Sequence, residues 1–182
     1  TSFEIASTGR NGPVLIDVPK EVQEQELDDY VLGTIPTPGY KPTIKGNSKQ
    51  IAKAAQMLKS AERPFILAGG GTILAGAGEE VKKLAELVKA PVATTLMGKG
   101  IVDEKDDISI GMLGMHGTKA SNLGVSECDL LIAIGARFSD RVLGNPKKFA
   151  SGAKILHIDI DAAEINKNIK TDADLVGDLK EV

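Results

Sequence analysis

Two arginines follow a continuous apolar run, and their type and position indicate chemistry. The run is Leu130 to Ile134; it ends at Gly135, and Arg137, Asp140 and Arg141 come soon afterwards. An uninterrupted apolar stretch predicts a strand buried on both faces, as in parallel sheets, whose ligands lie beyond the carboxyl ends of the strands. Because arginine keeps its charge and offers a planar fork of donors, the pair suits a phosphate or a carboxylate. A surface ion-pair network is the competing interpretation.

A glycine triplet is the second candidate site. Gly69, Gly70 and Gly71 follow the apolar stretch 65–68, and glycines let backbone N–H groups approach a pyrophosphate closely. The spacing is not the dinucleotide fingerprint G-x-G-x-x-G, the next helix is expected only near Gly78, and the following strand exit carries no acid for an adenosine ribose. These features weigh against an ordinary nicotinamide site. By its motif alone the triplet is equally consistent with a tight turn.

Other polar and soft side chains have two interpretations each. Asp159 follows a later predicted strand, where it would either accept hydrogen bonds from a ribose or cap the next helix. Met112 and Met115 would either lie against a flat ring or pack in the core. His116 and His157 are the only histidines, and nothing in the sequence pairs them as metal ligands. With a single cysteine there is no zinc spacing, so no metal site is predicted.

The elements that must position these groups alternate along the chain. Strands are predicted near 65–68, 91–95, 130–134, 154–161 and 175–176, and helices near 47–58, 78–89, 118–126 and from 161 onward. Such alternation predicts an α/β fold with a doubly wound, Rossmann-like parallel sheet of about six strands. Residues 101–115 are predicted to be mostly loop, and 179–182 to begin a further helix.

The first 46 residues differ from this pattern. Residues 3–7 are compatible with a helix and residues 14–18 with a short strand, so 1–20 are expected to be the tail of a preceding domain. Residues 21–46 carry acids and then prolines, which favour an extended interdomain linker. Residues 47–182 would form the second domain. The chain starts without Met and ends within a predicted helix, so we expect it to be a piece of a longer protein.

Composition excludes several classes of protein. The chain has 182 residues, a net charge of −3 and 3% aromatic residues, so neither a basic nucleic-acid surface nor a stacking platform for bases is expected. The one cysteine, Cys128, begins the buried run and is expected to be a packed, inert thiol in a cytoplasmic protein. No stretch is long and apolar enough to span a bilayer, and no signal peptide is visible, so no membrane partner is expected.

Taken together, the segments resemble the middle domain of the acetolactate synthase (acetohydroxyacid synthase) catalytic subunits, a family of thiamine-diphosphate enzymes. The segments that carry the resemblance follow the family's order over nearly the whole chain: 12–20, 67–71, 94–98, 111–117, 135–142 and 157–161. The most specific part is 112–117 followed by 137–141. Ser139 stands where family members usually carry Asp.

The resemblance implies a three-domain enzyme. A first domain would supply a glutamate that activates thiamine, a third would hold the diphosphate and magnesium, and this middle domain would bind FAD, which does no net redox work. The whole enzyme would condense pyruvate with a second 2-ketoacid, pyruvate or 2-ketobutyrate, in branched-chain amino acid biosynthesis. The isolated fragment would be inactive because the chemistry belongs to the missing parts. The resemblance also implies a homo-oligomer and, as a further partner, a regulatory subunit.

The resemblance gives roles to individual residues. FAD would be contacted by residues from every predicted strand exit: Gly69, Gly70, Gly71, Thr95, Leu96, Leu113, Met115, His116, Gly135, Arg137, Arg141, Val142, Asp159 and Asp178. Among these, the glycine triplet would approach the phosphates, Asp159 would bind the ribose and Asp178 would lie near the adenine. Asp140 and Arg141 would lie at the mouth of the active site, where Arg141 would select the second ketoacid through its carboxylate.

Two alternatives stay open. The same fold serves as a flavin-free scaffold or regulatory middle domain in other thiamine-diphosphate decarboxylases and carboligases. A different flavin- or nicotinamide-binding domain of the same architecture, such as an electron-transfer flavoprotein segment, is the third possibility.

Overall fold

The computed structural model describes residues 1–27, 33 and 39–182, which divide into two compact units, Thr1–Pro42 and Thr43–Val182. In the first unit, α1 (Ser2–Ser7) and α2 (Lys20–Gln23) are short helices. The helix predicted over 3–7 is therefore confirmed. Pro36 and Pro38 of the predicted linker lie outside the described residues.

The strand predicted over 14–18 is wrong. These residues form no strand within the described part of the chain, and the side chains of Leu15 and Ile16 are 89% and 64% exposed. A strand needs a neighbour to accept and donate its backbone hydrogen bonds. The described residues of the first unit contain no strand that could pair with this one, so an apolar sequence alone is not sufficient.

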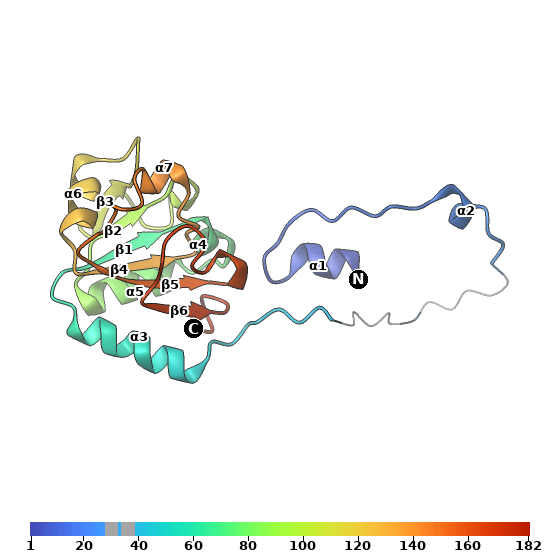
Figure 1. The fold of residues 1–182 in the computed structure, drawn as a ribbon, viewed down its shortest axis with the longest axis horizontal. Coiled ribbons are helices and arrows are strands. Elements are labelled where there is room, and N and C mark those ends of the chain that lie inside the picture. Colours follow the sequence, from blue (N-terminus) through green and yellow to red (C-terminus); the bar gives the residue numbers. More distant parts are fainter. Residues whose placement is uncertain (28–32, 34–38) are drawn as a thin grey trace. The chain divides into compact units, whose positions relative to one another are not determined.

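The second unit contains a six-stranded parallel sheet of order β3-β2-β1-β4-β5-β6 (Figure 1). Its strands are β1 (Pro64–Ala68), β2 (Val92–Thr94), β3 (Ser109–Met112), β4 (Leu130–Ile134), β5 (Lys154–Asp159) and β6 (Ala173–Val176). The predicted doubly wound α/β fold is confirmed. The chain builds outward from β1 to β3 and then returns to place β4 beside β1. Doubly wound sheets bind ligands at such a switch in direction.

Helices cover both faces of the sheet. The helical segments are α3 (Ser48–Ser60), α4 (Gly70–Leu74), α5 (Gly78–Val88), η1 (Leu96–Gly98), α6 (Lys119–Glu127), α7 (Asp140–Leu143) and η2 (Ala162–Glu164). Figure 1 shows α3 and α5 on one face and α6 and α7 on the other, in agreement with the two separate apolar clusters of the core. None of the described helices is both long and apolar enough to cross a bilayer.

The two central strands explain why the sheet forms. Every residue of β1 and β4 is buried, with Ile66 and Ile132 packed toward α3 and α5, and Leu67 and Leu131 toward the other face. Burying one such side chain contributes roughly 1.5–3 kcal/mol. The continuous apolar runs in the sequence were therefore a correct signal for strands buried on both faces.

Three local predictions are wrong. Residues 109–112, expected to be loop, form the edge strand β3, and an unpredicted short helix, α4, begins at Gly70, ahead of the predicted helix that does begin at Gly78 as α5. The stretch 179–182 is a turn, not the start of a helix. Asp161 does act as an N-cap, accepting from Ala163 at 2.9 Å, but the segment that follows is only one turn of 3-10 helix. In the first two cases tertiary contacts decide the local structure.

An apolar groove lies on the α3–α5 side of the sheet. Side chains from both helices and from β4, β5 and β6 line a cavity of about 300 Å³, together with Leu179 and Val182. The groove lies on one face of the sheet. The site residues predicted from the sequence lie elsewhere, at the carboxyl edge of the sheet.

Candidate functional site at the carboxyl edge of the sheet

The glycine triplet meets the exit of β4 at the switch in strand order. Gly69 N–H donates to the Ile134 carbonyl at 2.9 Å, and Gly71 N–H donates to the Gly135 carbonyl at 3.0 Å. A Cβ at Gly69 would lie 2.2 Å from the Gly135 oxygen, and one at Gly71 would lie 2.7 Å from the Gly135 Cα. Close packing of two strand exits therefore requires both glycines. Within the described chain, Gly70 alone of the three keeps a backbone N–H that could donate to a ligand.

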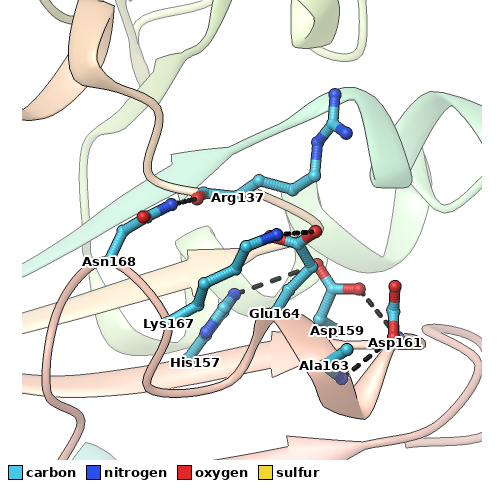
Figure 2. A network of polar contacts seen from close by, with 8 residues as sticks. All are labelled: Arg137, His157, Asp159, Asp161, Ala163, Glu164, Lys167 and Asn168. Atoms are coloured by element: carbon cyan, nitrogen blue, oxygen red, sulfur yellow. Dashed lines mark hydrogen bonds and ion pairs between the residues drawn. The ribbon is translucent and has the colours of Figure 1, made fainter.

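The turn after β4 exposes the side chains of Arg137 and Arg141 to solvent. Phe138 has a φ of +51°, which costs a non-glycine residue about 1–2 kcal/mol, yet its side chain is buried. Its ring makes edge-to-face contacts with His157 and Phe149, at centroid distances of 5.0 and 6.2 Å. With Phe138 anchored inside, Arg137 and Arg141 on either side of it are exposed. Figure 2 shows the Arg137 side chain directed away from the polar network beneath it.

The loop from β3 to α6 packs against this turn. Met115 N–H donates to the Arg141 carbonyl at 3.0 Å, and Arg141 Nη1 lies 3.9 Å from Met115 Sδ. Gly114, with a φ of +108°, has no room for a side chain, because a Cβ would lie 2.5 Å from the same carbonyl. The two segments that carry the most specific part of the sequence resemblance are therefore in direct contact. Arg141 Nε lies 3.9 Å from Asp140 Oδ2 on the surface, where an ion pair contributes little to the stability of the fold.

Asn122, which the sequence analysis did not single out, holds this loop. Its side chain accepts from Gly114 N–H at 3.2 Å and donates to the Gly114 carbonyl at 3.1 Å. The arrangement copies a pair of backbone hydrogen bonds between strands. Asn122 lies in the first turn of α6, whose start is capped by the Thr118 hydroxyl. An asparagine shortly after a glycine-rich loop was the available signal, but its partner depends on the folded structure.

The exit of β5 presents a buried carboxylate. Asp159 is 7% exposed, and its Oδ1 accepts from Asp161 N–H at 2.9 Å (Figure 2). Burial raises the pKa of the Asp159 carboxyl, although the Asp161 N–H and the nearby His157 act in the opposite direction. Asn168, from the segment after η2, donates to the Arg137 carbonyl at 3.0 Å and links this strand exit to the arginine turn.

The remaining predicted site residues lie at the same edge but differ in accessibility. Leu96 and Met115 are 69% and 64% exposed, and His116 is also exposed. Leu113 is 3% exposed and packs in the core, so it supports the loop from below. The others are half-buried: Thr95, Val142 and Asp178.

Two of these half-buried residues already have structural roles. Thr95 N–H extends the sheet ladder by donating to the Ala68 carbonyl at 2.9 Å. Asp178 donates its N–H to the Ile44 carbonyl at 2.8 Å, and its Oδ1 accepts from Lys180 N–H at 2.9 Å. All three hydrogen bonds are made with backbone groups of neighbouring residues. Their presence at this edge is therefore explained by the fold as well as by a ligand.

Cys128 lies at the other end of β4. It is buried, and burial raises the pKa of its thiol to about 11, with the charge of Asp129 acting in the same direction. The prediction of a packed thiol is confirmed by its burial, and the raised pKa disfavours the reactive thiolate at neutral pH. Across the described residues, no group of three or more His, Cys, Asp or Glu side chains is placed to hold a metal ion.

The carboxyl edge thus combines several kinds of contact. Arg137 and Arg141 offer positive charge, Asp159 offers a carboxylate, and Leu96 and Met115 offer exposed apolar surface. A ligand with anionic, hydroxyl-bearing and flat apolar parts fits this set. The contacts come from the exits of strands on both sides of the switch in strand order, where ligands of doubly wound sheets bind.

Comparison with known proteins decides the family. The family described as "Thiamine pyrophosphate enzyme, central domain" matches residues 51–182. The chain belongs to this family. It is 58% identical to a probable acetolactate synthase large subunit of Methanocaldococcus jannaschii, over 100% of this chain and 31% of that protein. It is 55% identical to a protein of the same name from Methanococcus aeolicus, over 99% and 31%, and 47% identical to the acetolactate synthase of Arthrospira platensis, over 100% and 32%.

These relatives confirm the resemblance to acetolactate synthases inferred from the sequence. The chain spans about a third of the length of the curated relatives it matches. The family match also covers all six strands of the sheet and every predicted site residue.

Proposed function

We propose that the chain is the central, FAD-binding part of an acetolactate synthase catalytic subunit. The observation that carries this proposal is its similarity, along its whole length, to proteins that bear that name. The complete enzyme would condense pyruvate with a second 2-ketoacid, pyruvate or 2-ketobutyrate, in branched-chain amino acid biosynthesis in the cytoplasm. Its partners would be these ketoacids, further copies of the same chain and a regulatory subunit.

The cofactors divide between the parts of the enzyme. Thiamine diphosphate, held with magnesium by other parts, supplies the decarboxylation and carboligation chemistry, and FAD supplies no net oxidation or reduction. The chain by itself would bind and orient without turnover. An assay for acetolactate formation by the purified 182-residue chain should therefore give no product, and product formation would contradict the proposal.

The residues at the carboxyl edge have the chemistry that FAD requires. Arg137 and Gly70 N–H would donate to the phosphates, and Asp159 would accept from the ribose hydroxyls, as carboxylates at strand exits do for adenosine riboses. The exposed side chains of Leu96 and Met115 would lie against the flat ring system. Arg141, exposed beside Met115, would bind the carboxylate of the second ketoacid, with Asp140 next to it.

A titration of FAD into the chain, followed by quenching of flavin fluorescence, tests the cofactor assignment. The Arg137→Ala/Arg141→Ala variant should lose at least about tenfold in affinity, because each charge-assisted hydrogen bond contributes about 1.5–3 kcal/mol. A matched control is Lys59→Ala/Lys154→Ala, which removes the same charge near the starts of β1 and β5, at the opposite edge of the sheet. Equal affinities for the two double variants would contradict the proposed site.

The flavin-free scaffold remains the second candidate, and one observation favours it. Gly69 and Gly71 are explained by packing against Gly135 without any ligand. Under this hypothesis the full-length protein would be purified without flavin absorbance and would take up none from added FAD.

A further inference from the structure

His157 is the one described residue whose buried side-chain nitrogens have no hydrogen-bond partner. It is 0% exposed, in the middle of β5, and neither Nδ1 nor Nε2 makes a hydrogen bond of good geometry to a described residue. The backbone of Ala136 lies near the ring and acts to raise its pKa, so it competes with Asp159 for the imidazole proton. Leaving a buried polar group unpaired costs about 1–3 kcal/mol. Most folds avoid that cost by placing an apolar residue at such a position, so this histidine requires an explanation.

The ring lies between two elements of the candidate site. On one side Phe138, the anchor of the arginine turn, makes its edge-to-face contact with the imidazole. On the other side His157 Nε2 lies 3.8 Å from Asp159 Oδ2 (Figure 2). That separation is too long for a hydrogen bond, so forming one requires the ring or the carboxylate to shift.

The two oxygens of Asp159 have different surroundings. Oδ1 accepts from Asp161 N–H, and Oδ2 faces His157. Burial opposes ionisation of the Asp159 carboxyl and raises its pKa. The negative charges of Asp161 and Glu164, which follow β5, raise that pKa further. Glu164 is itself paired with Lys167 at 3.0 Å, and Asp174 of β6 lies opposite His157 in the sheet register. A donor beside Oδ2 would offset these effects.

We propose that His157 is a positioning residue whose Nε2–H donates to Asp159 Oδ2 and keeps that carboxylate ionised and oriented toward the hydroxyl groups of a ribose. The proposal deepens the FAD assignment and rests on it for the identity of the ligand. Burial lowers the pKa of the imidazole, so the ring is neutral at pH 7 and carries one proton. That proton must be on Nε2 for the bond to Asp159 to form.

The wild-type chain provides the first test, which does not depend on any ligand or variant. Long-range ¹H–¹⁵N spectra distinguish the two neutral tautomers of a histidine ring. We expect His157 as the Nε2–H tautomer at pH 7. The Nδ1–H tautomer would overturn the proposal, because the nitrogen facing Asp159 would then have no proton to donate.

Two variants provide the second test. His157→Phe keeps the ring contact with Phe138 and removes the donor, whereas His157→Gln restores an N–H at a similar reach. ¹³C-carboxyl NMR of the chain, assigned with Asp159→Asn, should show Asp159 protonating at higher pH in His157→Phe and returning toward wild type in His157→Gln. A purely packing role would predict an unchanged Asp159 titration in His157→Phe.

An FAD titration separates this proposal from the function on which it rests. We expect His157→Phe to weaken FAD binding about tenfold at pH 7, with recovery in His157→Gln. If wild type binds FAD and His157→Phe binds equally well, the positioning role is overturned and the cofactor assignment stands. If wild type binds no FAD, the ligand assignment fails, and the tautomer and carboxyl titrations still decide whether His157 controls Asp159.

Discussion

At the scale of single residues, two features define the site: a backbone position with no space for a side chain, and a buried carboxylate. Gly135 and Asp159 illustrate the two cases. Gly135 has a φ of +56° and lies against the backbone of Gly71 and Thr72. Asp159 is a carboxylate in surroundings that favour its neutral form. The conformation of Gly135 is free of strain only because it lacks a Cβ. The buried carboxylate of Asp159 is costly to the fold, and ionisable groups with perturbed pKa values concentrate at functional sites.

Replacing Gly135 by alanine should destabilise the chain strongly. The left-handed backbone and a Cβ 2.7 Å from the Gly71 Cα together predict a loss of roughly 2–4 kcal/mol in the free energy of unfolding. Gly152→Ala is the matched control, since a Cβ there meets nothing within 4 Å. Urea unfolding of both variants checks this, and a Gly135→Ala variant as stable as Gly152→Ala would contradict the close packing of the two strand exits.

Replacing Asp159 by asparagine should remove a pH-dependent loss of stability while weakening FAD binding. The folded-state pKa of Asp159 is raised, so the wild-type fold loses stability as pH rises from the unfolded value of about 3.9 through the folded one. Asparagine does not ionise, so it removes this pH-dependent loss, and it can still accept from Asp161 N–H. Melting temperatures should show that the difference between Asp159→Asn and wild type moves in favour of the variant from pH 4 to pH 7. A difference that moves in the opposite direction, or does not change with pH, would contradict the buried, disfavoured charge.

At the scale of elements, the loop between β3 and α6 depends on one side chain. Asn122→Ala removes both hydrogen bonds to Gly114, a loss of about 1–2 kcal/mol if the loop stays in place. Amide hydrogen exchange of Gly114 and Met115 should become about tenfold faster or more. Ser126→Ala, one turn further along α6 and bonded only to the Asn122 carbonyl, should leave these amides unchanged. Equal exchange in both variants would show that Asn122 does not hold the loop.

The elements also show how far sequence reasoning reaches. The strands β1 and β4 were predictable because a short, uninterrupted apolar run is typical of a strand buried on both faces of a parallel sheet. The edge strand β3 was not predictable, because its sequence, with Ser109 and Gly111 among four residues, has no continuous apolar run. Its half-buried position explains why no such run is needed. The short helix α4 was missed because its glycines suggested a turn, whereas packing against Gly135 fixes them as the start of a helix.

The site itself was predictable only in part, for a related reason. Parallel strands place their exits at one edge, so Arg137, Arg141 and Asp159 could be grouped from the sequence alone. The roles of Asn122 and His157 could not, because they depend on side-chain partners that only the folded structure brings together. The close fit of Gly69 and Gly71 against Gly135 was hidden for the same reason.

At the scale of the whole molecule, the parallel topology gathers residues from Gly69 to Asp178 at one edge of a single sheet. The apolar groove between α3 and α5 lies on a face of that sheet and offers a chemically different surface, lined almost entirely by apolar side chains. A cofactor with phosphates and a ribose should therefore choose the carboxyl edge and leave the groove unaffected.

A backbone amide ¹H–¹⁵N map of the chain, recorded during addition of FAD, tests this claim most directly. We expect the largest shift changes at Gly70, Met115, Arg137, Arg141 and Asp159, with little change in α3 and α5. Changes centred on α3, α5 and β6, or none anywhere at saturating FAD, would contradict a cofactor site at the carboxyl edge of the sheet.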